Sequence, residues 1–192
     1  MLASYGIRTT PSFEQRVANL PSGGGNNLEA VYNEYLKSDI KDTSLPCLPP
    51  NVATRNMETM KGLYVLQVTS IKNIGVSKEE REKGDDARGK RTLMFCFTDG
   101  AQEVVGVEFE PLHDLKLADI GYGTKFAVEN VTIRRGIMLL TARNFKRLGG
   151  SIPRPPVDLT QRDSASEDNN NASGIRRPSV VDVNDRRKRR KS

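Results

Sequence analysis

Residues 94–109, MFCFTDGAQEVVGVEF, decide the fold of this chain. Two apolar, strand-like runs meet at Thr98-Asp99-Gly100-Ala101, and Asp-Gly tolerates the positive backbone angles of a tight type I′ turn. The run before the turn is apolar from Leu93 to Phe97, as in a strand that is covered on both faces. After the turn, residues 104–109 alternate with a period of two, so this strand has one inner face. The stretch therefore predicts a β-hairpin in the middle of a small β-structure.

Outward from the hairpin, three more segments are typical of strands. Leu63–Ile74 is a long run of apolar and β-branched residues that precedes the hairpin. Lys125–Ile133 and Ile137–Leu140 follow it, separated by the turn Arg134-Arg135-Gly136. Strands this short, joined by turns, predict a closed five-stranded Greek-key barrel, that is, an OB-fold, so the expected fold class is mainly β.

Helices are expected on both sides of the barrel. Asn27 can cap an amphipathic helix whose apolar residues recur at helical spacing as far as Ile40, and we expect this helix to dock on its own domain rather than serve as a free partner-binding helix. Pro111–Asp119 fits a short helix with proline in its first turn. Thr141 can cap a C-terminal capping helix over Ala142–Leu148.

Composition divides the chain of 192 residues into four parts. Residues 1–27 contain a Gly- and Asn-rich run and predict a mostly flexible N-terminal segment, with one short helix around Phe13–Leu20. Residues 28–61 supply the amphipathic helix and an extended proline strap, and residues 62–150 supply the OB-fold. Residues 151–192 are polar, carry most of the net charge of +6, and predict a disordered basic tail.

The segment Gly75–Lys90, GVSKEEREKGDDARGK, has as many basic as acidic side chains and almost no apolar ones. It cannot offset its own ordering entropy by burial, so it predicts a mobile loop between the first two strands. A loop of this length inside a small domain is either functional or a simple insertion.

Several classes of protein are disfavoured by the residues themselves. No apolar run is long enough to span a bilayer, so we expect no membrane segment. Cys47 and Cys96 lie in different contexts and predict two reduced thiols rather than a disulfide or metal pair. His113 is the single histidine, and no nucleophile elbow or phosphate-binding loop is present. We therefore expect neither an enzyme nor a metal or cofactor site.

Two short signals lie in the tail. Ser179 follows two arginines and a proline, a pattern that basophilic kinases favour, and is a candidate phosphorylation site. An unbroken basic hexamer predicts nuclear localisation and a weak, nonspecific contact with DNA, with a merely solvated charge run as the alternative. Its members are Arg186, Arg187, Lys188, Arg189, Arg190 and Lys191.

A barrel that binds single-stranded nucleic acid is the main alternative function. Such OB-folds expose aromatic side chains on the second and third strands, among basic residues. Here alternation places Phe95, Phe97 and Phe109 mainly in the core, while Glu103 and Glu108 would repel phosphate. The remaining basic residues come late and could form a small patch: Arg134, Arg135, Arg143, Lys146 and Arg147. The tail is the better candidate for contact with nucleic acid.

Several segments, taken in order, resemble one known family. They are Val31–Asp42 followed by Leu45-Pro46 and Leu48-Pro49, Gly62–Val68, Leu93–Gly100, Val107–Phe109, Gly123–Lys125, Gly136–Leu140 and Leu148–Gly150. This order and spacing resembles the N-terminal OB-fold of the RecQ-mediated genome instability protein 1 family, a pattern shared with tudor-domain-containing protein 3. The resemblance covers residues 28–150.

The resemblance implies a noncatalytic scaffold that binds and stabilises a type IA topoisomerase, topoisomerase III, and modulates its gate. It also implies an assembly with a RecQ-family helicase, bound directly or through the topoisomerase, that dissolves double Holliday junctions in homologous recombination, DNA repair and DNA replication. In this family the loop between the first two strands reaches into the gate, and apolar positions lie on the same side. At Val107 and Ile137 plain core packing is the alternative. Carried over by position, the partner-binding residues are Gly75, Val76, Ser77, Lys78, Glu79, Arg88, Lys90, Val107 and Ile137.

The chain also departs from the family pattern. The loop is shorter and more highly charged than in vertebrate members, the helical bundle before the barrel looks reduced to one clear helix, and we expect no second OB-fold or tudor domain. A small barrel with a basic hexamer favours a nuclear protein of the genome-stability branch. A tudor-domain-containing protein 3-like partner of a topoisomerase, acting with RNA, is the alternative within the family.

Overall fold

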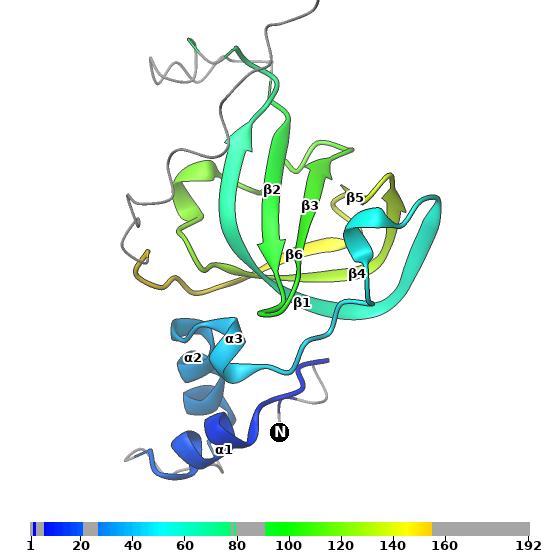
Figure 1. The fold of residues 1–192 in the computed structure, drawn as a ribbon. Helices are drawn as coiled ribbons and strands as arrows, with labels where there is room; N and C mark the ends of the chain where they lie inside the picture. The colour runs from blue at the N-terminus through cyan, green and yellow to red at the C-terminus, as the bar shows by residue number, and fades with distance from the viewer. Residues whose placement is uncertain (1, 3–5, 21–26, 78, 80–90, 155–192) are drawn as a thin grey trace, which may run out of the picture. The chain divides into compact units, whose positions relative to one another are not determined.

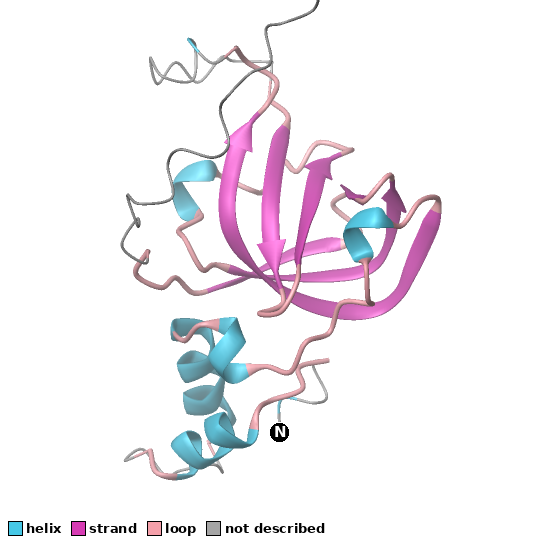
Figure 2. Cartoon of the chain, viewed as in Figure 1, coloured by secondary structure: helices cyan, strands magenta, loops and turns pink. Residues whose placement is uncertain are grey.

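The computed structural model of the protein describes residues 2, 6–20, 27–77, 79 and 91–154, which are drawn as the coloured ribbon in Figure 1. The long strand β1 (Glu58–Asn73) pairs in antiparallel fashion with β2 (Leu93–Thr98) and with β4 (Lys125–Arg134). β2 pairs with β3 (Glu103–Glu108), β3 runs parallel to β5 (Ile137–Leu140), and β5 pairs with β4. The circuit of five strands is closed, so the predicted mainly-β OB-fold barrel is confirmed (Figures 1 and 2).

β1 belongs to both sides of the barrel because it bends. Gln67 lies opposite Thr98 of β2 and also opposite Lys125 of β4, so it marks the point where the strand passes from one partner to the other. A bulge lies at Gly62, which has a φ of 101° and donates its N–H to the side-chain oxygen of Asn130 at 2.9 Å. Bulges of this kind let a single strand turn the corner of a small barrel.

Four phenylalanine rings fill the barrel. Phe126 and Phe145 are stacked with their ring centres 4.5 Å apart, and Phe95 and Phe97 are stacked at 5.3 Å. All four side chains are buried. Gly106 of β3 faces the same space, where a Cβ would lie 2.9 Å from the Phe97 ring. The rings therefore form the centre of the hydrophobic core rather than an exposed stacking surface.

The turn of the hairpin differs from the prediction. β2 and β3 are joined by the four residues Asp99–Gln102, and among them only Gly100 has a positive φ, of 95°. The predicted type I′ turn is therefore wrong. β2 alternates between buried and half-buried residues instead of being covered on both faces. Phe109, which we expected in the core, follows β3 on its outer side and is exposed.

The predicted capping helix over Ala142–Leu148 is wrong. A turn leads instead into β6 (Phe145–Gly149), which pairs with β4 as a continuation of β5 along the same edge. The Asn144 side chain holds this turn, because its Oδ1 accepts the Thr141 N–H at 2.9 Å and its Nδ2 donates to the Leu139 carbonyl at 3.0 Å. Burial of Phe145 among the core rings then outweighs the helical propensity of the segment.

The short helix predicted over Pro111–Asp119 is also wrong in its extent. Only the 3-10 turn η4 (Leu117–Asp119) is present. The Glu108 carboxylate accepts the Leu112 N–H at 2.7 Å and fastens the start of this segment to the barrel. Leu112 and Leu115 are nevertheless buried.

In the described residues before the barrel lie three α-helices, α1 (Pro11–Ala18), α2 (Leu28–Lys37) and α3 (Ile40–Thr43), and the 3-10 turn η3 (Val52–Thr54). The N-termini of the α-helices are capped by the side chains of Thr10, Asn27 and Asp39, of which the Asn27 cap was predicted. The short helix expected around Phe13–Leu20 is present as α1, whereas the expectation of a single clear helix before the barrel is wrong for the described residues. We call α1, α2 and α3, with the described residues before α1, the helical module.

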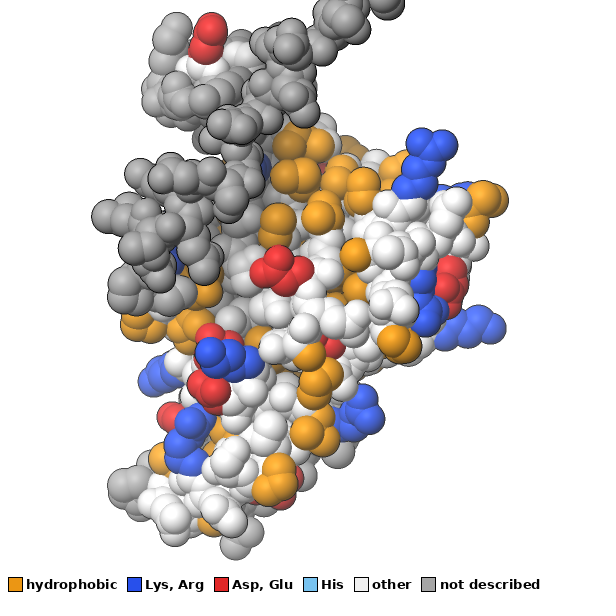
Figure 3. All heavy atoms as spheres, viewed as in Figure 1, with side chains coloured by type: hydrophobic (Ala, Val, Ile, Leu, Met, Phe, Trp, Pro, Cys, Tyr) orange, Lys and Arg blue, Asp and Glu red, His pale blue; other side chains and the backbone are white. Residues whose placement is uncertain are grey.

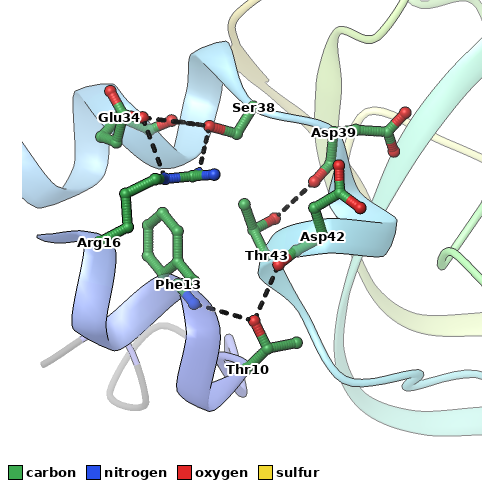
Figure 4. A network of polar contacts seen from close by, with 8 residues as sticks. All are labelled: Thr10, Phe13, Arg16, Glu34, Ser38, Asp39, Asp42 and Thr43. Carbon is green, nitrogen blue, oxygen red and sulfur yellow. Dashed lines mark hydrogen bonds and ion pairs between the residues drawn. The ribbon is translucent and has the colours of Figure 1, made fainter.

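Polar contacts, drawn in Figure 4, and one ring pair hold the helical module together. Arg16 of α1 donates to Ser38 at 2.7 Å and lies 3.4 Å from the carboxylate of Glu34, which ties α1 to the end of α2. The rings of Phe13 and Tyr35 meet edge to face at 6.1 Å, and both are buried. α2 thus docks on its own domain, as predicted.

The helical module is fastened to the barrel at two buried polar side chains. Gln67 of β1 accepts the N–H of Ile40 at 2.9 Å. Lys125 of β4 donates its ammonium group to the carbonyl oxygens of Leu36 and Ser38, at 3.3 and 2.6 Å. Among the described residues, no helix is long and apolar enough to cross a bilayer.

Candidate partner-binding surface

The outer side of β2, β3 and β5 carries a continuous set of apolar side chains. The pairing register lines them up in two rows across the three strands, because residues directly opposite one another point to the same face. The rows are Cys96–Val105–Ile137 and Met94–Val107–Leu139. Figure 3 shows hydrophobic side chains gathered over β2 and β3. We call these six residues, together with Phe109, the outer apolar face.

Phe109 is the most exposed member of the outer apolar face. Its side chain is 65% exposed, compared with 36% for Ile137. Its backbone is nevertheless fixed, since its N–H donates to the Leu140 carbonyl at 2.9 Å. A large exposed aromatic side chain on a fixed backbone is the kind of residue that commonly anchors an interface.

The base of the loop between β1 and β2 lies at the same end of the barrel as Phe109, because the arrowheads of β1 and β3 point to that end (Figure 1). Asn73 closes this base: its Oδ1 accepts the N–H of Gly75 and the N–H of Thr92, both at 3.0 Å. Ile74 donates its N–H to the Thr92 carbonyl at 2.8 Å. The entry and the exit of the loop are therefore held side by side.

Glu108 strengthens this end of the barrel from inside. Its carboxylate accepts the Leu93 N–H at 2.8 Å and the Leu112 N–H at 2.7 Å, and Arg91 lies 3.3 Å away in an ion pair. Only 6% of the Glu108 side chain is exposed. The expectation that Glu108 presents a charge to an approaching phosphate is therefore wrong, and its role is to join the loop exit to β2 and β3.

The predicted partner-binding residues fall into two groups. Val107 and Ile137 lie on the outer apolar face, so the alternative of plain core packing does not hold for them. Gly75, Ser77 and Glu79 are exposed beyond the loop base, whereas Val76 is buried. The other candidates lie outside the described residues: Lys78, Arg88, Lys90, Ser179 and the hexamer from Arg186 to Lys191.

Phe109 is the residue that the sequence reading missed. Alternation in β3 shows that Val105, Val107 and Phe109 share a face, but not which face lies inside. The signal that decides it is Gly106, because a glycine among large residues marks the side where neighbouring side chains approach most closely. With Gly106 inside, Phe109 must lie outside.

The alternative of a nucleic-acid surface finds little support in the geometry. Within the part of the chain that the structure describes, Phe109 is the only exposed aromatic side chain. The late basic residues do not form one patch: Arg134 lies at the far end of β4, whereas Lys146 is paired with Ala127. Arg134 and Ala127 are seven residues apart on β4, a distance of roughly 23 Å along the strand.

Comparisons with known proteins agree with this architecture. A family model described as "RMI1, N-terminal OB-fold domain" matches residues 48–162. RecQ-mediated genome instability protein 1 of Arabidopsis thaliana is 39% identical over 121 residues, which is 63% of this chain and 19% of the relative. The protein of the same name from Oryza sativa subsp. japonica is 33% identical over 156 residues, 78% of this chain and 19% of the relative.

A second kind of relative shares the domain. Tudor domain-containing protein 3 of Danio rerio is 31% identical over 118 residues, 61% of this chain and 16% of the relative. The chain therefore spans about a fifth of the length of the plant relatives and less of the tudor one.

Proposed function

Because the chain belongs to the family of the RMI1 N-terminal OB-fold domain, we propose that it is a noncatalytic scaffold that binds and stabilises a topoisomerase III and modulates its gate. The plant and vertebrate relatives are named for RecQ-mediated genome instability, which supports a role beside a RecQ-family helicase in maintaining genome stability. In this role the assembly dissolves double Holliday junctions and so serves homologous recombination, DNA repair and DNA replication.

The observation that carries the proposal is the outer apolar face beside a closed loop base. An apolar surface on a rigid sheet, with one exposed ring, favours a protein partner over a polar ligand. The base of the loop lies at the same end of the barrel as Phe109, which supports one partner for both. Binding and modulation of the gate then involve one continuous contact.

The tail enters the proposal separately. We propose that the basic hexamer from Arg186 to Lys191 directs the protein to the nucleus and adds a weak contact with DNA. An outer face made of apolar side chains with a single aromatic ring gives less support to single-stranded DNA binding by the barrel itself, and to a tudor-type role with RNA.

The test is co-expression with a topoisomerase III followed by gel filtration at micromolar concentration. We expect the two proteins to elute together, and Phe109→Ala to weaken the complex by roughly tenfold or more, as truncation of an interface anchor does. The matched control is Leu45→Ala, which shortens another exposed apolar side chain away from the outer apolar face. Separate elution of the wild-type proteins would contradict the proposal, as would equal effects of the two substitutions.

A further inference from the structure

A groove of about 1310 Å³ lies beside β6 and is made by other parts of the chain than the outer apolar face. Its apolar lining includes Leu63 of β1, Ala127 of β4 and Leu148 of β6. Leu28 and Tyr32 add a wall from α2. Leu28 and Leu63 are among the exposed large apolar side chains of the protein, so this surface is open to a partner.

The edge of β6 borders the groove. β6 pairs with β4 along one edge, and no second strand is paired with it in the part of the chain that the structure describes. Every residue from Ala142 to Gly149 contributes to the lining. A strand that presented only one face would contribute every second residue, so the backbone edge itself faces the groove. Such an edge offers N–H and C=O groups to an added strand.

Three exposed cations accompany this edge: Arg143, Lys146 and Arg147. None of them forms an ion pair with another described residue. The carboxylates in the lining, Glu29, Asp114 and Glu129, come from three other segments. The cations are therefore gathered along β6, while the carboxylates lie on the elements around it, Glu29 on α2 and Glu129 on β4, where the Glu129 N–H donates to the Asn144 carbonyl at 2.9 Å.

We propose that this groove binds an extended, acidic segment of a partner protein, which adds a strand to the free edge of β6. Main-chain hydrogen bonds to β6 supply affinity, and alternate side chains of the added strand contact Leu63, Ala127 and Leu148. Lys146 lies opposite Ala127 and so shares the face of these apolar side chains, whereas Arg147, opposite Phe126, lies on the other face. Acidic residues of the added strand can therefore form charge-assisted contacts on either face. The five residues of β6 offer a pairing length of roughly 17 Å.

The charge pattern favours a peptide over nucleic acid in this groove. A phosphodiester backbone carries a negative charge at every step, so it meets the carboxylates of Glu29, Asp114 and Glu129 as well as the cations. A peptide can place its acidic residues next to β6 alone. Basic residues on an edge strand also serve elsewhere to prevent pairing with another chain, but such edges face open solvent and not an apolar floor.

The experiment uses the full chain and two labelled decapeptides, one alternating glutamate with valine and one alternating lysine with valine. Fluorescence anisotropy measures affinity, and NMR amide exchange reports protection of β6. We expect the acidic peptide to bind, to slow exchange of β6 amides, and to lose at least roughly tenfold in affinity when Lys146→Glu and Arg147→Glu are combined. The matched control combines Arg134→Glu with Arg135→Glu, which changes the net charge equally at a distant turn.

The outcomes separate binding of an acidic strand at β6 from the alternatives. Loss of affinity confined to the β6 double variant, with protection of β6, supports the proposal. Absence of binding, equal weakening by both double variants, or unprotected β6 amides would overturn it. Displacement of the peptide by single-stranded DNA at a lower concentration would assign the groove to nucleic acid instead. Phe109→Ala must leave peptide binding unchanged, which separates this site from the outer apolar face and its topoisomerase.

Discussion

Asp99 connects the hairpin to a distant part of the chain. One carboxylate oxygen accepts the N–H groups of Cys47 and Leu48 at 3.0 and 2.8 Å, and the other accepts those of Ala101 and Gln102 at 3.0 and 2.8 Å. Burial favours the neutral acid, but these four donors outweigh it and hold the pKa of Asp99 below its usual value. The proline strap is thereby fixed to the turn.

Asp99→Asn is expected to lower the free energy of unfolding at pH 7 by roughly 2–3 kcal/mol. The reason is that the NH₂ group of the new asparagine would replace a carboxylate oxygen that accepts two N–H groups. The wild-type carboxylate has a lowered pKa, so its contribution is present above 3.8 and is lost as the pH falls through the folded value. Urea unfolding at pH 7 and at about pH 3 should therefore show the two proteins converging on acidification. The control Asp119→Asn changes an exposed carboxylate. A constant difference between wild type and Asp99→Asn would contradict the assignment.

The turn residues could be read from the sequence, but their long-range partners could not. Asp99-Gly100 signals a turn through local backbone preferences, whereas the bonds from Asp99 to Cys47 and Leu48 join positions that only the folded barrel brings together. Gly100 is required for a similar reason, since a Cβ there would lie 2.7 Å from the Lys41 Cα of α3. Local patterns carry no information about such approaches.

At the scale of the elements, strands with strong periodicity were predictable and weakly biased segments were not. The predicted bounds of β5 match the structure, because a short apolar run between Gly136 and Thr141 has few alternatives. β6 was mistaken for a helix because its residues tolerate either state, and tertiary packing of Phe145 decides between them. Asn144, which holds the turn before β6, is the local signal for a strand at this position.

The closed base of the β1–β2 loop leads to a prediction about that loop. Replacing residues 78–90 by a short Gly-Ser linker keeps Gly75 and the buried Val76, and with them the contacts of Asn73. We expect the thermal midpoint to stay within about 2 °C of wild type, because no described core residue is removed. Binding to a topoisomerase III should persist through Phe109, whereas the rate of decatenation should change. An unchanged rate would reduce the loop to an insertion.

At the scale of the whole domain, a buried cation joins the helical module to the barrel. Lys125 lies under the end of α2, where its ammonium group meets two carbonyl oxygens and lies 5.3 Å from the centre of the Tyr35 ring. Burial lowers the pKa of Lys125 to about 8, against the opposing charge of Asp39. Lysine side chains are rarely fully buried without a partner. Only the docked module buries Lys125.

The lowered pKa makes the stability of this junction depend on pH. Between pH 8 and 10.5 the unfolded chain holds a proton that the folded chain has released, so the contribution of Lys125 to the free energy of unfolding rises with pH. Burial raises the pKa of Tyr35 to about 12 and that of Cys47 to about 11. Because the folded chain keeps these protons to higher pH than the unfolded chain, both groups make the free energy of unfolding fall as the pH rises.

Tyr35 and Cys47 are the same in wild type and in Lys125→Met, so the difference in stability between the two proteins isolates the pH dependence due to Lys125. Across that interval the stability of wild type relative to the variant should rise by up to roughly 3 kcal/mol, measured by urea unfolding at several pH values. A difference that stays flat or falls would show that the lysine is not held as a buried cation.

The shared strand β1 also governs the order in which this protein can be completed on the ribosome. β1 and the hairpin leave the exit tunnel before β4, and Lys125 emerges after both carbonyl groups that it must reach. Until then a nascent chain carries an unpaired β1 edge and a half-built core. Products released before Leu140 therefore cannot close the barrel, and their fate is aggregation or degradation rather than a smaller working domain.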